Sequence, residues 1–182
     1  MHDWNVVVTA HEKGYILTCE LLEEIGLGPF AYTDFFNVIV MKVPEPQELL
    51  AKVVEIHRQS PDLFTYGIAR VAPAQHAFDF QTPEAFENKA RDVVLAWLPA
   101  LAGKSFHVRL HRRGFKGRLS TPKEERFLDE AVLSALQAAG TPGSLSFDDP
   151  DAIIQIETVG NRAGLSLWSR EELARYPFLK VD

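Results

Sequence analysis

The sequence predicts an α/β chain of the α+β type, divided into two domains at residues 1–75 and 76–182. Three observations lead to this prediction. Residues 5–71 alternate strand-like and helix-like apolar patterns, and a second such series follows. The two parts also differ in charge, since residues 1–75 contain five basic and ten acidic residues. The basic residues of the second part are concentrated in one stretch. Such an asymmetry concerns binding partners more than the fold.

The first domain is predicted from β-branched runs and helical apolar stripes. Helices are expected over residues 15–25, with Gly26 as the C-cap, and over residues 46–58, where Pro46 takes the first helical position. Strands are expected at residues 5–9, 29–33, 36–43 and 64–71. The resulting order, β-α-β-β-α-β, is the split β-α-β pattern of ferredoxin-like folds. Residues 72–81 have the proline and polar content of a linker.

The second domain begins with a predicted helix that Thr82 caps and that continues to about Gly103. A strand follows at residues 106–111, and a longer helix reaches Gly140. That helix is expected to begin in a capping box formed by Thr121 and Glu124, with Pro122 at the first helical position. Two strands at residues 152–158 and 164–168 and a short helix within residues 169–179 complete the prediction.

The most informative stretch runs from Lys104 to Arg126, where eight basic residues stand against two acidic ones in a chain whose formal net charge is −6. In the strand, Phe106, Val108 and Leu110 alternate with polar residues, which predicts one core face and one basic face. Residues two apart on that basic face lie about 6 to 7 Å from each other, a spacing that can follow successive phosphates. A polyanion is therefore the expected ligand.

Residues of this stretch are assigned to RNA binding by their chemistry. Arginine and lysine are expected to contact phosphates, the two histidines to add hydrogen bonds, and Phe115, beside two glycines, to stand out and stack on a base. The start of the following helix offers a further anion site. Whether Arg112, on the other parity of the strand, joins this surface depends on where the strand ends. The predicted RNA-binding residues are His107, Arg109, His111, Arg112, Arg113, Phe115, Lys116, Arg118 and Lys123.

Other classes of function find less support in the sequence. No nucleophile motif, phosphate loop or dinucleotide fingerprint is present, and the six histidines lack partners at metal-ligand spacing. We therefore expect no enzyme activity, no cofactor and no metal. Asp148, Asp149 and Asp151 are read as turn formers rather than as a magnesium site. The sequence has no run of about 18 apolar residues and no secretory signal pattern, so a cytoplasmic protein without a membrane partner is expected.

The chain resembles proteins with a THUMP domain, the RNA-binding module of several tRNA-modifying enzymes. The resemblance rests on the basic strand FHVRLHRRG before a helix, with Arg109, Arg112 and Arg113 as its cluster. It also rests on the turn Asp149-Pro150-Asp151 before a strand rich in isoleucine and on the terminal RYPFL. THUMP domains commonly follow a small ferredoxin-like domain, which agrees with the pattern of the first domain. The chain most resembles stand-alone members, including the adaptor of a tRNA acetyltransferase.

This resemblance implies a non-catalytic protein that binds the 3′ acceptor end of tRNA and orients it for a separate tRNA-modifying enzyme. The alternative is a protein-interaction scaffold that uses the acidic first domain and has little RNA binding. A KH domain is disfavoured because its G-x-x-G loop joins two helices, whereas Gly114–Gly117 joins a strand to a helix. An RRM-like role of the first domain is disfavoured because Phe35 and Phe36 have no basic neighbours.

Overall fold

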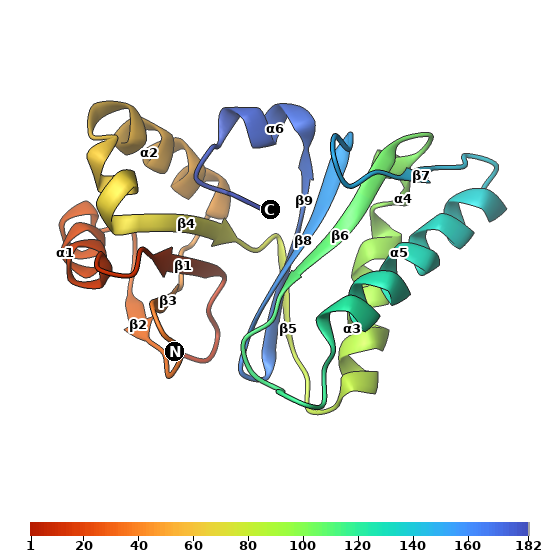
Figure 1. The fold of residues 1–182 in the computed structure, drawn as a ribbon, viewed down its shortest axis with the longest axis horizontal. Coiled ribbons are helices and arrows are strands. Elements are labelled where there is room, and N and C mark those ends of the chain that lie inside the picture. Colours follow the sequence, from red (N-terminus) through yellow and green to blue (C-terminus); the bar gives the residue numbers. More distant parts are fainter. Residues whose placement is uncertain (182) are drawn as a thin grey trace. The chain divides into compact units, whose positions relative to one another are not determined.

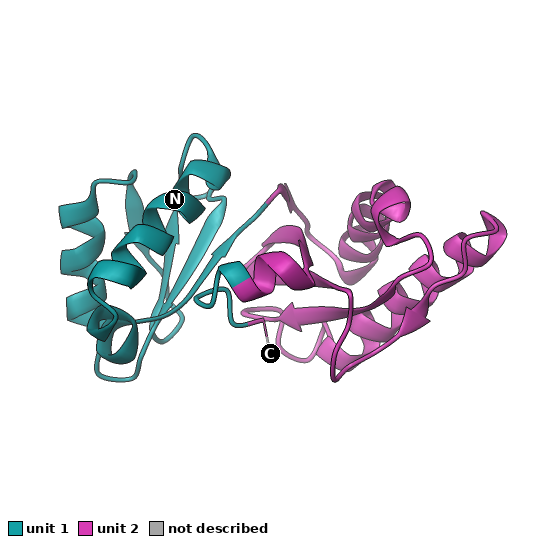
Figure 2. Ribbon diagram, turned by 90° about the horizontal axis from the view of Figure 1, so that it is seen from above, with its two compact units in different colours: residues 1–74, 175–180 teal, residues 75–174, 181–182 magenta. Residues whose placement is uncertain are grey.

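The computed structural model describes residues 1–181 and separates into two compact units, coloured in Figure 2. Unit 1 contains Met1–Ala74 together with Arg175–Lys180, and unit 2 contains Gln75–Ala174 together with Val181. The segment 175–180, placed by the sequence in the second domain, thus groups with unit 1.

Two contacts within unit 1 explain this grouping. The backbone N–H of Val71 donates to the carbonyl oxygen of Phe178 at 3.0 Å. The ring of Phe178 lies 6.2 Å from that of Phe64 and is buried. The C-terminal segment therefore completes the apolar core of unit 1.

Unit 1 is a four-stranded antiparallel sheet with two helices on one face (Figure 1). The strand order is β2-β3-β1-β4, and the chain order β-α-β-β-α-β is the one predicted. Gly26 ends the first helix in the left-handed conformation, with φ of 61°, as its C-cap role requires. The elements are β1 (Val6–Ala10), α1 (Tyr15–Ile25), β2 (Phe30–Tyr32), β3 (Val38–Met41), α2 (Pro46–Gln59) and β4 (Ile68–Pro73).

The predicted strand at residues 64–71 is wrong in its first half. Leu63–Gly67 form a short π-helix, η1, and β4 begins only at Ile68. The turn that precedes β4 is helical, because the N–H groups of Phe64 and Thr65 both donate to the carbonyl of Pro61. This turn buries Phe64 against His57, whose ring centroid lies 4.8 Å away.

Unit 2 is a mixed five-stranded sheet of order β5-β9-β8-β6-β7, with α3 and α5 packed on one face (Figure 1). β6 runs parallel to β7 and β8, and β9 pairs antiparallel with β8 and β5. The fold class predicted from the sequence, a mixed α/β chain, is confirmed. The elements are β5 (His76–Asp79), α3 (Pro83–Ala96), α4 (Leu98–Leu101), β6 (Ser105–His111), α5 (Thr121–Ala138), β7 (Ser144–Leu145), β8 (Ala152–Val159), β9 (Arg162–Ser169) and α6 (Arg170–Arg175).

The first part of unit 2 differs from the prediction in two features. Part of the expected linker forms β5, an edge strand that pairs only with β9, and an edge tolerates its polar residues. The helix expected to reach Gly103 breaks at Trp97 and resumes as α4, because Pro99 has no N–H to donate. The cap by Thr82 is confirmed, since its Oγ1 accepts from the N–H of Ala85 at 3.1 Å.

The position of α5 against β6 is fixed by two carboxylates. β7 pairs with β6 only at Ser105 and Phe106, so later N–H groups of β6 need other acceptors. Val108 donates to Oδ1 of Asp129 at 2.9 Å, and Leu110 donates to Oε1 of Glu125 at 2.8 Å. One helical turn separates the two carboxylates, and two residues separate the two donors, so the pairs match in register.

We predict that Asp129→Ala lowers the free energy of unfolding by about 1–3 kcal/mol, because it leaves the buried N–H of Val108 without an acceptor. Chemical denaturation measures this change. Glu130→Ala, on an exposed residue of the same helix, is the matched control and should change stability by less than about 0.5 kcal/mol. Equal losses in both variants would show that the contact with β6 does not matter.

Candidate nucleic-acid interface

The loop that connects β6 to α5, residues 112–120, is called the basic loop. Its path depends on glycine. Gly114 has a φ of 103°, and a Cβ built on it would lie 3.0 Å from the Cα of Gly160. The N–H of Gly160 donates to the carbonyl of Arg113 at 2.9 Å, which joins the loop to the β8–β9 turn. The loop is therefore held close to a second backbone, which a larger residue at Gly114 would push away.

β6 ends at His111, so Arg112 is free of the strand's alternation and does turn toward the surface. Its guanidinium donates to the carbonyl of Gly114 and lines a cavity of about 490 Å³. Arg118 lies in the same cavity, and its guanidinium sits 4.8 Å above the ring of Phe115. We call this cavity the basic pocket; it is lined by Arg112, Gly117, Arg118, Leu119, Ser120, Thr121 and Pro122.

The first turn of α5 forms one wall of the basic pocket. The predicted capping box is wrong, because the N-cap is Ser120, not Thr121, and its side chain makes no capping hydrogen bond. A capping box forms instead at Ser169 and Glu172, where each side chain accepts from the other residue's N–H. The uncapped first turn of α5 leaves N–H groups and a partial positive charge at the pocket.

A second hollow of about 360 Å³ adjoins the basic pocket and shares Pro122 with it. Lys123 and Arg126 line it, with Phe127 and Glu130. Lys123 also pairs with Glu87 of α3 at 2.8 Å, and this hydrogen bond raises the pKa of the lysine. Arg126 was missing from the predicted site. Its helical spacing from Lys123 was the signal that placed both on one side of α5.

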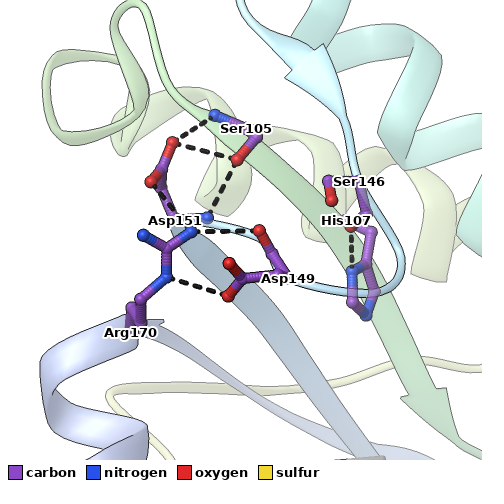
Figure 3. Close-up of polar contacts among 6 residues, drawn as sticks. All are labelled: Ser105, His107, Ser146, Asp149, Asp151 and Arg170. Carbon is purple, nitrogen blue, oxygen red and sulfur yellow. Dashed lines mark hydrogen bonds and ion pairs between the residues drawn. The ribbon is translucent and has the colours of Figure 1, made fainter.

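His107 is not part of an exposed basic face. Its side chain is only 4% exposed, and its Nδ1 lies 2.7 Å from the carbonyl oxygen of Ser146 (Figure 3). Its ring also packs 5.3 Å from that of Phe147, which is 66% exposed. The expectation that His107 faces solvent is therefore wrong, because the loop after β7 covers it.

The remaining residues of the strand divide between surface and interior. Arg109 is exposed, as expected. His111 is half-buried, and its Nε2 lies 3.1 Å from the carbonyl oxygen of Val181. Arg113 pairs with the buried carboxylate of Glu157 at 2.5 Å, so its charge is largely neutralised within the fold. Lys116, in the loop, is exposed.

Phe115 packs inward instead of standing out. Its ring lies 4.8 Å from that of Phe80, a buried residue of the core, and the guanidinium of Arg118 lies 4.8 Å from its centroid. The expectation that the two glycines let this ring stack on a base is wrong in its geometry. The glycines turn the loop so that the ring reaches the core.

We predict that Phe115→Ala lowers the free energy of unfolding by about 2 kcal/mol, because a half-buried ring is lost from the core. Phe147→Ala is the matched control, since it removes an exposed ring, and it should leave stability nearly unchanged. Thermal and chemical denaturation measure both variants. If Phe115→Ala leaves the free energy of unfolding unchanged, the ring of Phe115 does not belong to the core.

A buried carboxyl group lies behind the first turn of α5. The side chain of Glu124 is 1% exposed, and within residues 1–181 neither carboxyl oxygen has a hydrogen-bond partner; Nζ of Lys123 lies 3.8 Å from Oε1. Burial, with the negative charge of Glu87 as the next cause, raises the pKa of Glu124 to about 7. Burial likewise raises the pKa of Asp129 to about 7, against the opposing effect of its bond from Val108. Both groups thus ionise near neutral pH.

These pKa values predict how stability depends on pH. The folded chain holds the Glu124 proton more tightly than the unfolded chain, so the free energy of unfolding falls as pH rises from 4.5 to about 7. Asp129 contributes in the same direction. Glu124→Gln should remove the part of this pH-dependent loss that Glu124 causes, which is on the order of 3 kcal/mol at pH 8. Denaturation at pH 5 and pH 8 measures the difference.

Glu130→Gln serves as the control in this series, because Glu130 is exposed on the same helix and should leave the pH profile unchanged. A Glu124→Gln variant whose stability falls with pH as steeply as that of the unaltered chain would contradict a raised pKa at Glu124.

The turn Asp149-Pro150-Asp151 is structural (Figure 3). The carboxylate of Asp151 accepts from the N–H and the hydroxyl of Ser105, both at 2.9 Å. The backbone bond from Ser105 is the main cause that lowers the pKa of Asp151. Arg170 pairs with Asp149 at 3.1 Å and with Asp151 at 3.3 Å. These contacts tie the start of β6 to the starts of β8 and α6.

Within residues 1–181, no group of three or more His, Cys, Asp or Glu side chains is arranged to hold a metal ion. The same residues contain no helix with the length and apolar character needed to span a membrane.

The fold is shared with solved structures at low sequence identity. TrmN from Thermus thermophilus aligns with a TM-score of 0.60 and 18% identity, over 89% of this chain and 44% of that one. A 4-thiouridine synthetase, solved as a complex with RNA and bound ATP, aligns with a TM-score of 0.57 and 13% identity, over 92% of this chain and 42% of that one. A possible methylase from Clostridium difficile 630 aligns with a TM-score of 0.56 and 14% identity, over 90% of this chain and 40% of that one.

At these identities the likeness shows the fold alone. The chain spans less than half of the length of each of these three structures. No protein-family model and no curated protein matches the sequence.

Proposed function

We propose that this chain binds RNA through the basic pocket and presents the 3′ acceptor end of tRNA to a separate RNA-modifying enzyme, without catalysing a reaction itself. The observation that carries the proposal is that Arg112 and Arg118 line one pocket together with the uncapped first turn of α5. Planar guanidinium groups and helix N–H groups are the donors that suit phosphate oxygens.

The fold itself holds the two guanidinium groups of the basic pocket in place. Arg118 rests on Phe115 and donates to the carbonyl of Gln81 at 3.3 Å, while Arg112 is held by Gly114. Among residues 1–181, neither guanidinium forms an ion pair with a carboxylate, in contrast to Arg113 with Glu157. The field of these cations is therefore available to a ligand.

Further cations extend the surface away from the pocket. Lys116 is exposed in the same loop, and Lys123 and Arg126 lie in the adjoining hollow. Such a series of cations suits a polyanion better than a single phosphate ion. The fold shared with a 4-thiouridine synthetase that was solved with RNA supports the same class of ligand.

The finer parts of the proposal rest on the resemblance to THUMP proteins. The sequence features that carry it are FHVRLHRRG, which supplies the pocket's Arg112, and the turn Asp149-Pro150-Asp151, which fixes the start of β8. The acceptor end of tRNA, the adaptor role and the partner enzyme follow from that resemblance.

We predict that a tRNA transcript binds the full chain and that Arg112→Glu with Arg118→Glu weakens binding about tenfold or more, because charge-assisted hydrogen bonds are lost. Fluorescence anisotropy measures the affinity. For contact with about four phosphates of a single strand, log K should fall with log salt at a slope near −3. Lys52→Glu with Arg58→Glu, on two exposed residues of unit 1, is the control with a matched charge change.

A second arm of the experiment tests the acceptor end. The same tRNA without its single-stranded 3′ nucleotides should bind more weakly, with a smaller salt slope. Equal affinity for both forms would exclude the acceptor end as the ligand. Failure of any tRNA to bind at low salt would exclude the proposed function as a whole.

A further inference from the structure

Exposed apolar side chains gather at one end of unit 1. Of the eight large hydrophobic residues that are exposed among residues 1–181, five belong to α1, β2, η1 and the β2–β3 turn. Phe36 is 78% exposed, Ile16 73% and Tyr66 66%. A concentration of such side chains on a small domain is unusual unless another molecule covers it. We call this group the apolar end; it comprises Ile16, Leu17, Tyr32, Phe36 and Tyr66.

Hydrogen bonds bring these segments together. The N–H of Ala10, at the end of β1, donates to the carbonyl of Asn37 at 2.9 Å. The next N–H, of His11, donates to the carbonyl of Gly67 at 2.8 Å. The β2–β3 turn and η1 are thus fixed on the two sides of the β1–α1 connection.

Side-chain contacts complete the apolar end. The rings of Tyr15 and Tyr32 lie 6.1 Å apart, and Gly14 is pressed against the backbone of Tyr66, where a Cβ would meet the carbonyl oxygen at 2.1 Å. A cavity of about 530 Å³ opens between α1 and the turn, lined by Tyr15, Glu12 and residues 33–37. The surface is therefore shaped and held by the fold.

The charge around this surface is negative. Residues 9–37 contain five acidic residues and one lysine, and Glu12 and Asp34 line the cavity itself. Phosphates would be repelled here. The apolar end and the basic pocket therefore suit different kinds of ligand. A second copy docking through the same patch would also place acidic residues against acidic residues.

We infer that the apolar end of unit 1 is a docking surface for a partner protein segment that carries apolar or aromatic side chains flanked by lysine or arginine. The apolar side chains fill the cavity beside Phe36, and the flanking cations meet Glu12 and Asp34. Apolar anchors combined with complementary charges beside them are typical of protein interfaces. The inference goes beyond the proposed RNA role and does not rest on it.

The test measures binding of short synthetic peptides to the full chain without RNA. One peptide is composed of lysine, leucine and phenylalanine, and its partner has glutamate in place of every lysine. We expect the lysine peptide to bind and the glutamate peptide not to bind. Isothermal titration calorimetry gives the affinities.

Variants then locate the binding. Ile16→Ser with Phe36→Ser should raise the Kd of the lysine peptide about tenfold or more, and Glu12→Lys with Asp34→Lys should raise it as well. Phe147→Ser is the control in unit 2, since it removes a ring that is 66% exposed, and it should leave the Kd unchanged. Because all these residues are exposed, thermal unfolding should show that each variant stays folded.

Four results would overturn the inference. The serine variant binds the lysine peptide as the unaltered chain does, or the glutamate peptide binds equally well. Alternatively, sedimentation shows a dimer of the chain that the serine variant abolishes, so that a second copy is the occupant. Finally, the serine variant loses tRNA affinity as Arg112→Glu with Arg118→Glu does, which makes the patch part of an RNA surface. Retained tRNA affinity keeps the two proposals separate.

Discussion

The two hydrogen bonds from backbone N–H groups of β6 to carboxylates of α5 are the constraint on which unit 2 depends. β7 is too short to pair with most of β6, so Asp129 and Glu125 act in place of a neighbouring strand. They fix the helix along the strand at a defined register. Every residue of the basic loop lies between these two elements, so their register fixes the two ends of the loop.

A second set of buried polar contacts fixes the other side of the loop. Arg113 pairs with Glu157, whose carboxylate also accepts from Gln155 at 3.2 Å, and Gln155 in turn accepts from Nε1 of Trp168 at 2.7 Å. This chain of contacts crosses from the loop through β8 to β9. A basic residue that sequence reasoning assigns to RNA thus has a demonstrable role in the fold, because a buried carboxylate needs a partner.

The sequence was sufficient for the fold class, for the order of elements in unit 1 and for the face of β6 that packs in the core. It was insufficient wherever a side chain's direction depends on distant residues. His107 lies under the loop after β7, which no local pattern places there, and Phe115 reaches Phe80 from a position 35 residues later in the chain. Arg126 was missed because the charge count identified a stretch, whereas the hollow beside α5 is defined by helical spacing.

The stacking of Arg118 on Phe115 has a consequence for recognition. A long side chain normally loses rotamer freedom when it grips a ligand, and this loss opposes binding. Here folding has already restricted the guanidinium by its contact with the ring and with the carbonyl of Gln81. A lysine at this position would supply the same charge, but without a planar group to lie on the ring it would remain mobile. The protein has thus ordered the group during its own folding, and an arriving phosphate meets a cation that already has its direction.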